Sequence, residues 1–302
     1  MAALPSLRQL RYLLALAEHL NFTRAAEASF VSQSTLSTGL KELESTLGVQ
    51  LVERNKQNVA LTAVGAEVVA RARQVLAAAE DLSDFASDAS RPMQGQLRLG
   101  VIPTIAPFVL PSVMPALRDQ FPQLQLALRE DLTAHLLERL RSRQLDFALI
   151  ALPYDTEDLH VEPLYKDRFC LVGREKDPAM SRKAMQLSSS WTERLLLLEE
   201  GHCLRDHALQ ACNATEVASV DGIEATSLLT LVQMVASGMG VALLPEMAVH
   251  SGLLNNLSLK SRPLAPPAPE RVIALVTRST SAHMAEFEAI ARVISSVQRK
   301  KK

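Results

Sequence analysis

The stretch NFTRAAEASFVSQSTLSTGLKELESTLG, residues 21–48, decides the N-terminal fold. Thr23 is expected to cap one short helix and Ser32 to cap a second that ends at Gly48, because hydroxyl side chains and glycine are favoured at those helix ends. Only a few residues, 29–32, remain for the turn between them. Two short helices joined by a tight turn predict a helix-turn-helix, whose second helix enters the major groove of DNA.

The flanking residues complete a small head. Residues 5–20 carry apolar side chains at helical spacing, which predicts a preceding helix. After Gly48, two short apolar stretches flank the polar ERNKQN, as expected of a two-stranded wing. We therefore expect a winged helix-turn-helix DNA-binding domain over residues 1–62. On these patterns alone, a helical bundle with a polar face is the alternative.

A long helix is predicted next, because residues 63–90 contain no proline and one glycine. A long helix with a single apolar stripe usually pairs with a copy of itself, so residues 63–92 are expected to link two chains in a homodimer. The predicted stripe consists of Val64, Val68, Ala72, Val75, Leu76, Ala79 and Leu82.

From residue 93 to residue 302 predicted strands alternate with helices, which indicates an α/β fold with mainly parallel sheets. Strands are expected at QLRLGVI, QLQLALRE, LDFALIAL, LYKDRFCLVGR, RLLLLEE, the ASV near 218–220, GVALLPEM and RVIALVTR. We expect a two-lobed regulatory domain like those of ligand-binding proteins, with crossing strands near 152–168 and 266–271. Lobe I would cover about 93–166 and 270–302, and lobe II about 167–269.

Composition narrows the class of protein. The net charge is −1 and there are three cysteines, too few for a secreted disulfide framework. No run of eighteen apolar residues predicts a membrane span. We therefore expect a cytoplasmic protein with no membrane partner.

The start of the second helix of the motif offers groups that hydrogen-bond to base edges, and basic residues nearby would meet phosphates. The inward face would carry Leu36, Leu40 and Leu43. The candidate DNA-binding residues are Arg24, Ser32, Gln33, Ser34, Thr35, Ser37, Thr38, Lys41, Arg54 and Lys56.

Residues 21–65 resemble the DNA-binding segment of LysR-type transcriptional regulators across its length, including Ala25, Ala26, Gln33 and Gly65. The chain departs from the pattern at Ser34, where many members carry proline, and at Thr38, where they often carry a basic residue or glutamine. These departures affect which DNA bases are recognised, not whether DNA is bound. The resemblance implies a DNA-binding regulator rather than an enzyme, a double-stranded operator as partner, and a homotetramer.

The stretch GHCLRDHALQAC, residues 201–212, contains two of the three cysteines. A zinc site is disfavoured because C-x8-C is not a usual ligand spacing, and no known signature of a cysteine hydrolase surrounds it. Cys170, in the apolar RFCLVG, is interpreted as an inert buried thiol. We therefore expect no metal and no cofactor.

For Cys203 a redox switch is favoured over an inert thiol. We expect an exposed thiolate, stabilised by His202, Arg205 and a helix N-terminus, which would attack hydrogen peroxide and leave a sulfenic acid. Cys212 is the obvious thiol to condense with it. If the intervening residues are helical, the two sulfurs are more than ~10 Å apart and the helix must open for a disulfide to form.

A closer resemblance supports this hypothesis. LLLLEEGHCLRDHALQAC, GVIPTIAPFVLP and ATSLLTLVQMVASGMGVALLP resemble segments of the OxyR hydrogen-peroxide-sensing subgroup of LysR-type regulators. It implies that Cys203 is the peroxidatic and Cys212 the resolving residue, and that a cellular thiol reductant recycles them. His207 stands where the subgroup usually has glutamine. The candidate peroxide-pocket residues are Thr104, Thr133, His202, Arg205, Asp206, Thr226 and Arg271, with Arg278 the alternative to Arg271.

Two other functions stay open. One is a LysR-type regulator that binds a small metabolite between its lobes, near Thr104, Thr133 and Thr226, with the cysteines incidental. The other is a stand-alone thiol peroxidase, against which the DNA-binding head argues.

Overall fold

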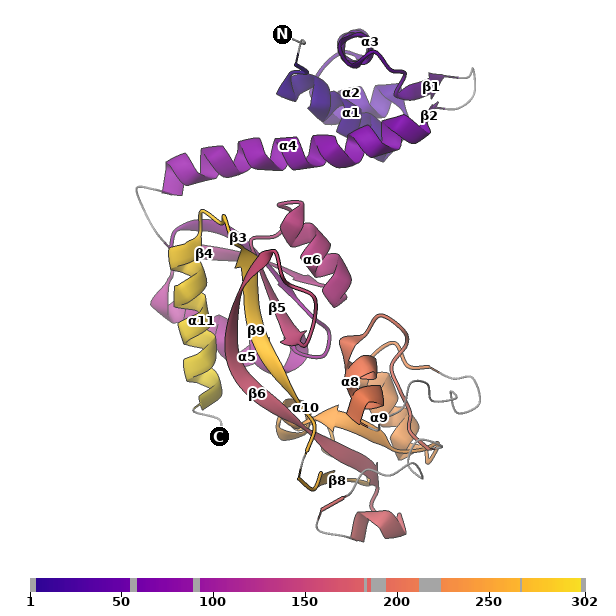
Figure 1. Ribbon diagram of the computed structural model, residues 1–302, viewed down its shortest axis with the longest axis vertical. Coiled ribbons are helices and arrows are strands. Elements are labelled where there is room, and N and C mark those ends of the chain that lie inside the picture. The colour runs from indigo at the N-terminus through magenta and orange to yellow at the C-terminus, as the bar shows by residue number, and fades with distance from the viewer. Residues whose placement is uncertain are drawn as a thin grey trace. The chain divides into compact units, whose positions relative to one another are not determined.

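The computed structural model describes residues 4–54, 59–88, 93–181, 184–185, 194–211, 224–266 and 268–299. The chain divides into two compact units, Met1–Ser90 and Arg91–Lys302 (Figure 1). No helix in these described ranges is long and apolar enough to cross a membrane.

The first unit is a three-helix head followed by a hairpin and a long helix. Its helices are α1 (Leu7–His19), α2 (Phe22–Ala28) and α3 (Gln33–Leu47). Ser32 caps α3 and Gly48, at φ 68°, ends it, both as predicted. Asn21, not Thr23, caps α2: its side chain accepts hydrogen bonds from the backbone N–H groups of Thr23 and Arg24. The Asn21 carboxamide therefore satisfies two of the unpaired N–H groups that begin the helix.

The wing consists of β1 (Val52–Arg54) and β2 (Val59–Leu61), which pair antiparallel. The Glu44 carboxylate of α3 accepts hydrogen bonds from the backbone N–H groups of Leu51 and Val52, at 2.8 and 3.1 Å. These bonds hold the start of the wing against the end of α3.

Helix α4 (Ala63–Asp88) carries apolar residues on two sides, so the predicted single stripe is wrong. Ala72 and Leu76 are buried in the core of the head together with Val69. By contrast, the exposed fractions of Val64, Val75 and Leu82 are 49%, 48% and 70%. Because the spacings of 11 and 7 residues return to nearly the same angle at 3.6 residues per turn, these three side chains share one face.

The second unit is built on a seven-stranded sheet with the order β4-β3-β5-β9-β6-β7, and β8 also pairs with β6. One lobe contains β3 (Gly95–Val101), α5 (Ala106–Gln120), β4 (Leu124–Glu130), α6 (Thr133–Arg141), β5 (Phe147–Leu152), β9 (Glu270–Arg278) and α11 (Met284–Arg299). Its core is formed by apolar residues of these elements, such as Leu99, Phe147 and Ile290.

The other lobe has its own core, which includes Leu171, Leu196 and Val232. It contains the 3₁₀ helix η1 (Pro178–Ser181), α8 (Cys203–Ala211), α9 (Leu228–Ala236), β7 (Ala242–Pro245), α10 (Glu246–His250) and β8 (Leu259–Pro263).

The long strand β6 (Leu159–Arg174) connects the two lobes. It pairs with β9 from Leu159 to Arg168 and with β7 and β8 beyond Phe169, so β6 and β9 run side by side between the lobes (Figure 1). The expectation of mainly parallel sheets is wrong. Among the described strands, β3 pairs parallel with β4 and β5, whereas the crossing strands pair antiparallel with all their neighbours.

Two predicted strands differ from the structure. RLLLLEE forms only isolated bridges, Leu195 with Val241 and Leu198 with Ala225. The ASV near 218–220 lies outside the described residues. Strand β8 was not expected, because its sequence LKSRP does not alternate and contains a proline.

Candidate functional site

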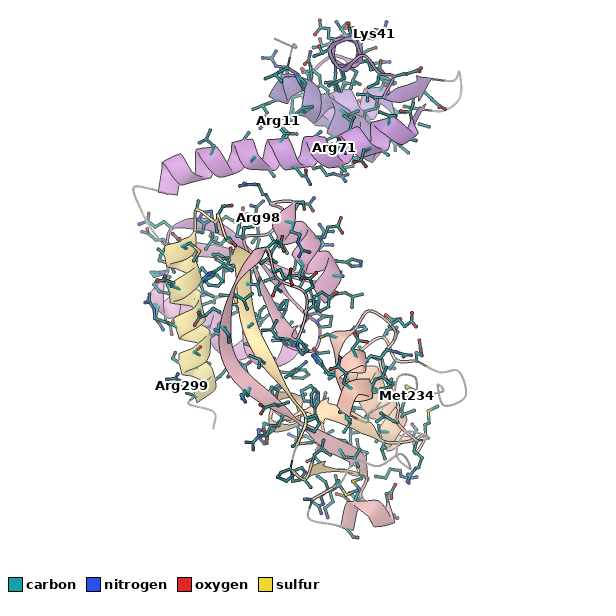
Figure 2. The ribbon with its side chains drawn as sticks, viewed as in Figure 1. Arg11, Lys41, Arg71, Arg98, Met234 and Arg299 are labelled. Carbon is teal, nitrogen blue, oxygen red and sulfur yellow. The ribbon has the colours of Figure 1, made fainter. Side chains whose placement is uncertain are left out.

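The start of α3 presents a cluster of hydroxyl groups. The Ser32 hydroxyl accepts a hydrogen bond from the backbone N–H of Thr35 at 3.1 Å, and lies 2.9 and 2.7 Å from the hydroxyl oxygens of Ser34 and Thr35. Ser37 is half-buried. The exposed residues of this face are Ser32, Gln33, Ser34, Thr35, Thr38 and Lys41, with Lys41 labelled in Figure 2. The polar face expected from the sequence therefore exists.

The opposite face of α3 fixes the helix in the head. Leu36, Leu40 and Leu43 are each 0% exposed, as predicted. Gly39 lets α1 approach closely, because a Cβ at this position would lie 2.8 Å from the Tyr12 ring. The approach brings the start of α1 beside the polar face of α3, where they line a hollow of about 560 Å³ that includes Ser6 and Arg8. Sequence reasoning missed this contribution of α1.

The remaining basic candidates are less defined. Arg24 is exposed on α2. The Arg54 side chain and the whole of Lys56 lie outside the described residues.

The thiol of Cys203 lies where the two lobes meet. Cys203 begins α8 and packs into the core of the lobe that contains β3, whereas Leu204 and Ala208 of the same helix pack into the other core. Its exposed fraction is 5%. The expectation of an exposed sulfur is therefore wrong: the first turn of α8 inserts into the apolar contact between the lobes.

Arg271 is the cation whose charge lowers the pKa of the Cys203 thiol. It is 0% exposed and lies on β9. Its Nε donates to the Asp167 carboxylate at 3.0 Å, its Nη1 to the Thr104 hydroxyl at 2.9 Å and its Nη2 to the Thr104 carbonyl at 3.1 Å. The guanidinium is thus held in one orientation by partners from β6 and from the start of α5.

The electrostatics at Cys203 oppose one another. Burial is the largest effect, and the pKa of the Cys203 thiol is raised on balance, although the Arg271 guanidinium and the Thr133 hydroxyl lower it and Asp206 raises it further. Thr133 lies at the start of α6, and its buried hydroxyl faces the Cys203 sulfur, the contact through which it lowers the pKa of the thiol, but forms no hydrogen bond of full geometry with any described residue. A small polar molecule beside the sulfur could take this hydroxyl as a partner.

The residues next to Cys203 in sequence do not act as expected. His202 is buried, its Nε2 is 3.7 Å from the Glu199 carboxylate, and burial lowers the pKa of its imidazole. Arg205 donates to the Leu198 carbonyl at 3.0 Å and to Glu224 at 2.8 Å. His202 and Arg205 were expected to stabilise a thiolate at Cys203. Arg271 is instead the cation that lowers the pKa of this thiol.

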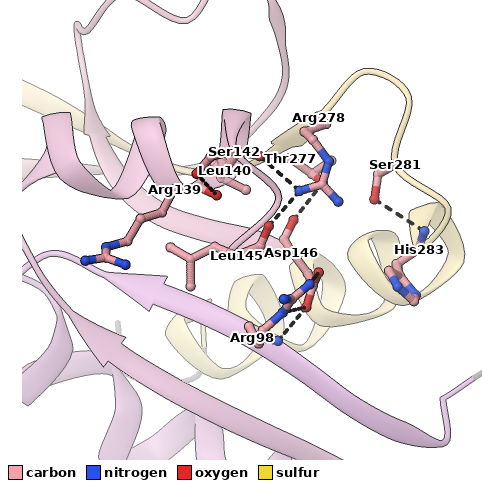
Figure 3. Close-up of polar contacts among 10 residues, drawn as sticks. All are labelled: Arg98, Arg139, Leu140, Ser142, Leu145, Asp146, Thr277, Arg278, Ser281 and His283. Carbon is pink, nitrogen blue, oxygen red and sulfur yellow. Dashed lines mark hydrogen bonds and ion pairs between the residues drawn. The ribbon is translucent and has the colours of Figure 1, made fainter. Parts of the chain in front are cut away.

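Three other predicted positions are resolved by the structure. Asp206 is exposed as a residue, but its carboxyl is partly shielded from water, which raises the pKa of that group. Thr226 is exposed one residue before Ser227, the N-cap of α9, and has no described hydrogen bond to the cysteine pocket. Arg278 lies at the far end of β9, where Nη1 donates to the carbonyls of Leu140 and Leu145 (Figure 3). Arg271, not Arg278, is thus the arginine beside the sulfur.

Sequence reasoning missed Asp167 and Tyr154. Asp167 fixes Arg271, but nothing in the local sequence of β6 distinguishes it. Tyr154 follows a cis Leu152–Pro153 bond, and burial together with the Cys203 sulfur raises the pKa of its phenol, which places it near the thiol.

His207 lies one turn after Cys203 on the buried side of α8. Burial, and then Arg271, lower the pKa of its imidazole to about 4, so it is neutral at pH 7. Its Nδ1 has no hydrogen-bond partner in the described residues, and its ring centroid is 6.2 Å from that of Phe169.

The other cysteines differ in their placement. Cys170 is buried on β6, and burial raises the pKa of its thiol to about 11, which agrees with an inert thiol. Cys212 lies outside the described residues. Within the described residues, no three His, Cys, Asp or Glu side chains gather where they could hold a metal ion.

Comparison with known families decides the class of protein. Residues 7–66 match the model "Bacterial regulatory helix-turn-helix protein, lysR family", and residues 90–299 match the "LysR substrate binding domain". The chain belongs to the LysR family. This LysR-family chain is a DNA-binding transcriptional regulator and not an enzyme, as the sequence predicts.

Relatives of this regulator cover nearly its whole length. It is 47% identical over 298 residues to the HTH-type transcriptional regulator EstR of Acinetobacter baylyi, covering 98% of each chain. It is 39% identical over 289 residues to the DNA-binding transcriptional dual regulator OxyR of Escherichia coli, covering 96% of this chain and 94% of that one.

Solved structures agree with the LysR fold. A full-length cysteine-to-aspartate variant of OxyR from Pseudomonas aeruginosa matches with a TM-score of 0.76 at 36% identity, over 97% of this chain and 98% of that one. A cysteine-to-serine variant of OxyR from Corynebacterium glutamicum, described as H2O2-bound, matches with a TM-score of 0.65 at 33% identity, over 100% of this chain and 95% of that one. These matches confirm the winged helix-turn-helix followed by a two-lobed α/β domain.

Proposed function

We propose that this LysR-family regulator senses hydrogen peroxide through Cys203. The observation that carries the proposal is the placement of this thiol: it is enclosed between the lobes near a buried guanidinium, that of Arg271, and faces the buried hydroxyl of Thr133. Similarity to proteins named OxyR supports it.

The chemistry needs only the thiol and the peroxide. Loss of the Cys203 proton gives a thiolate. Burial is the larger effect and opposes this loss, and the Arg271 charge offsets part of that cost. The sulfur attacks one peroxide oxygen, the O–O bond breaks, and an S–O bond forms. The second oxygen leaves as hydroxide and becomes water when it is protonated. Thr104 holds Arg271, and the Thr133 hydroxyl is available to donate a hydrogen bond to the peroxide.

The second step joins Cys212 to the oxidised sulfur. The Cys212 thiolate attacks the sulfenic sulfur, the S–O bond breaks, and the oxygen leaves as hydroxide, which takes a proton to become water, so a disulfide forms without a further oxidant. A cellular dithiol then reduces the disulfide by thiol exchange.

The geometry of α8 couples this bond to a conformational change. Eight helical steps from Cys203 to Ala211, at about 1.5 Å each, span roughly 12 Å. Since consecutive Cα atoms are about 3.8 Å apart, an intact α8 keeps the Cα atoms of Cys203 and Cys212 at least roughly 8 Å apart. A disulfide requires less than about 7 Å. Helix α8 must therefore unwind for the bond to form.

The output is a changed arrangement of the DNA-binding heads. We assign residues 1–62 to DNA binding, 63–92 to chain pairing and 93–302 to regulation. The exposed face of α4, formed by Val64, Val75 and Leu82, is the surface by which two chains pair. Contacts between regulatory domains would complete a homotetramer, and unwinding of α8 would alter them.

Thiol mapping tests the proposal. The reduced full-length protein is pulsed with micromolar peroxide, its free thiols are alkylated, and its peptides are analysed by mass spectrometry. We expect a Cys203–Cys212 disulfide in the parent protein and none in Cys203→Ser. Cys170→Ser is the matched control, because this thiol is also buried but only burial and the carboxylates of Glu246 and Asp167 shift its pKa, all upward, and it should behave as the parent. A transcriptional response to peroxide that survives Cys203→Ser would exclude the proposed switch.

A second candidate is a regulator that answers to a small molecule. EstR, at 47% identity, is named as a transcriptional regulator with no oxidant in its name. In that case peroxide would leave both thiols and operator binding unchanged.

A further inference from the structure

A cavity of about 540 Å³ lies in the second unit, and Cys203 is not among the residues that line it. Its walls come from the crossing strand β6, from helix α10 and from the C-terminal end of α11, where Arg299 is labelled in Figure 2. In Figure 1 the end of α11 lies to the left of the crossing strands, and α8 lies to the right. Its volume is within the range of about 300–1,000 Å³ that is typical of small-molecule sites.

The cavity combines apolar walls with unused polar groups. Phe108, Leu164 and Met247 supply the apolar surface. The Tyr165 hydroxyl and the Gln298 amide nitrogen are buried, line the cavity, and have no hydrogen-bond partner among the described residues. A buried donor without a partner costs about 1–3 kcal/mol. Two of them facing one cavity leave two places for acceptor atoms of whatever fills it.

The charges around the cavity also favour an acceptor. Lys166 and Arg299 contribute cationic groups, of which Lys166 already pairs with the carboxylate of Glu270. Of the two carboxylates, that of Asp167 is already engaged by Arg271 and by the backbone N–H of Met247, at 3.0 Å each. Only Glu246 is left among the lining carboxylates. Donor groups therefore outnumber acceptors in the described lining.

We propose that this cavity is a second input site, which binds a compact, mostly apolar molecule carrying a carboxylate or carbonyl oxygen. The oxygen accepts hydrogen bonds from Tyr165 and Gln298, and the apolar body packs on Phe108, Leu164 and Met247.

The cavity is joined to the thiol site by one ion pair. Asp167 lines the cavity, and its second carboxylate oxygen holds Arg271, the cation beside Cys203. A ligand that shifts Asp167 or the start of α10 therefore changes the position of Arg271 and with it the reactivity of the sulfur. This coupling rests on the proposed peroxide function, whereas binding at the cavity does not.

Calorimetric titration of the reduced full-length protein tests the binding, with phenylacetate as the carboxylate probe and methyl phenylacetate as the carbonyl probe. Binding of either supports the site, and the one that binds identifies the acceptor. Tyr165→Phe removes one hydrogen bond and should weaken the binding about fivefold.

Two phenylalanine variants on α11 locate the site. Ser295 is half-buried and lines the cavity, whereas Ser296 is exposed and does not. Ser295→Phe should abolish binding and Ser296→Phe should leave it unchanged. Binding that survives Ser295→Phe, or no heat with either probe up to about 10 mM, overturns the proposal. If Ser295→Phe does not fold, equal affinity in Tyr165→Phe and the parent overturns it. None of these measurements uses peroxide, so failure of the thiol switch leaves them unaffected.

Discussion

The stability of α8 should set the reduction potential of the proposed disulfide. The reduced protein contains the helix Cys203–Ala211, and the disulfide requires that it unwind. Gln210 is exposed on this helix, so its replacement changes helix stability with little change in packing. We compare Gln210→Gly with Gln210→Ala, two substitutions that differ mainly in helix propensity.

The magnitude follows from that difference. Glycine is about 1 kcal/mol less favourable than alanine inside a helix, and about 0.5–1 kcal/mol is expected at a position in the last turn. For a two-electron couple, about 30 mV corresponds to 1.4 kcal/mol. Glycine destabilises the reduced form, so the potential of Gln210→Gly should be roughly 10–20 mV more negative than that of Gln210→Ala.

The potential is measured by equilibrating each variant in dithiothreitol redox buffers, alkylating the free thiols and quantifying the oxidised fraction by mass spectrometry. Glu288→Gly and Glu288→Ala form the matched control, because Glu288 is exposed on α11, away from the cysteines. That pair should differ in unfolding free energy but not in potential. Equal potentials for the Gln210 pair, or a more negative value for alanine, would refute the requirement that α8 unwinds.

Three further outcomes are expected. Gly39→Ala places a Cβ 2.8 Å from the Tyr12 ring, so the head should lose about 1–3 kcal/mol of stability in urea unfolding; an unchanged midpoint would contradict the close packing of α1 on α3. His207 has a folded-state pKa of about 4 against 6.5 unfolded. The contribution of the neutral imidazole to the free energy of unfolding is therefore complete above pH 6.5 and is lost as the pH falls toward 4, by at most about 3 kcal/mol. The free energy of unfolding of His207→Gln should depend less on pH across this window than that of the parent. Identical curves would argue against a buried neutral imidazole. Lys41→Gln should weaken operator and non-operator DNA alike and reduce the slope of log affinity against log salt by about 1; a loss confined to the operator would instead indicate a base contact.

Much of the head follows from local sequence. Ser32 and Gly48 form their capping hydrogen bonds with residues three and four positions away, so the ends of α3 could be predicted without knowledge of the rest of the fold. The buried face of Leu36, Leu40 and Leu43 follows from helical periodicity. The cap of α2 was misassigned because both Asn21 and Thr23 can cap a helix, and sequence alone does not choose between them.

The cysteine site shows the limit of such reasoning. The reactive candidate could be identified from its neighbours in sequence, yet those neighbours are not what surrounds the sulfur. Arg205 turns to Glu224, while Arg271, 68 positions further along the chain, is the cation beside Cys203. Burial of this thiol was likewise unpredictable, because it depends on how the two lobes close around the first turn of α8.

The sequence by itself determined the helix-turn-helix and the pair of thiols nine positions apart, since each depends on residues that are close together in the chain. The tertiary structure alone decided that β6 and β9 cross antiparallel, which pairs Asp167 with Arg271 and sets that pair between the thiol and the cavity. Strand pairing joins residues more than a hundred positions apart, and no local pattern specifies such a register.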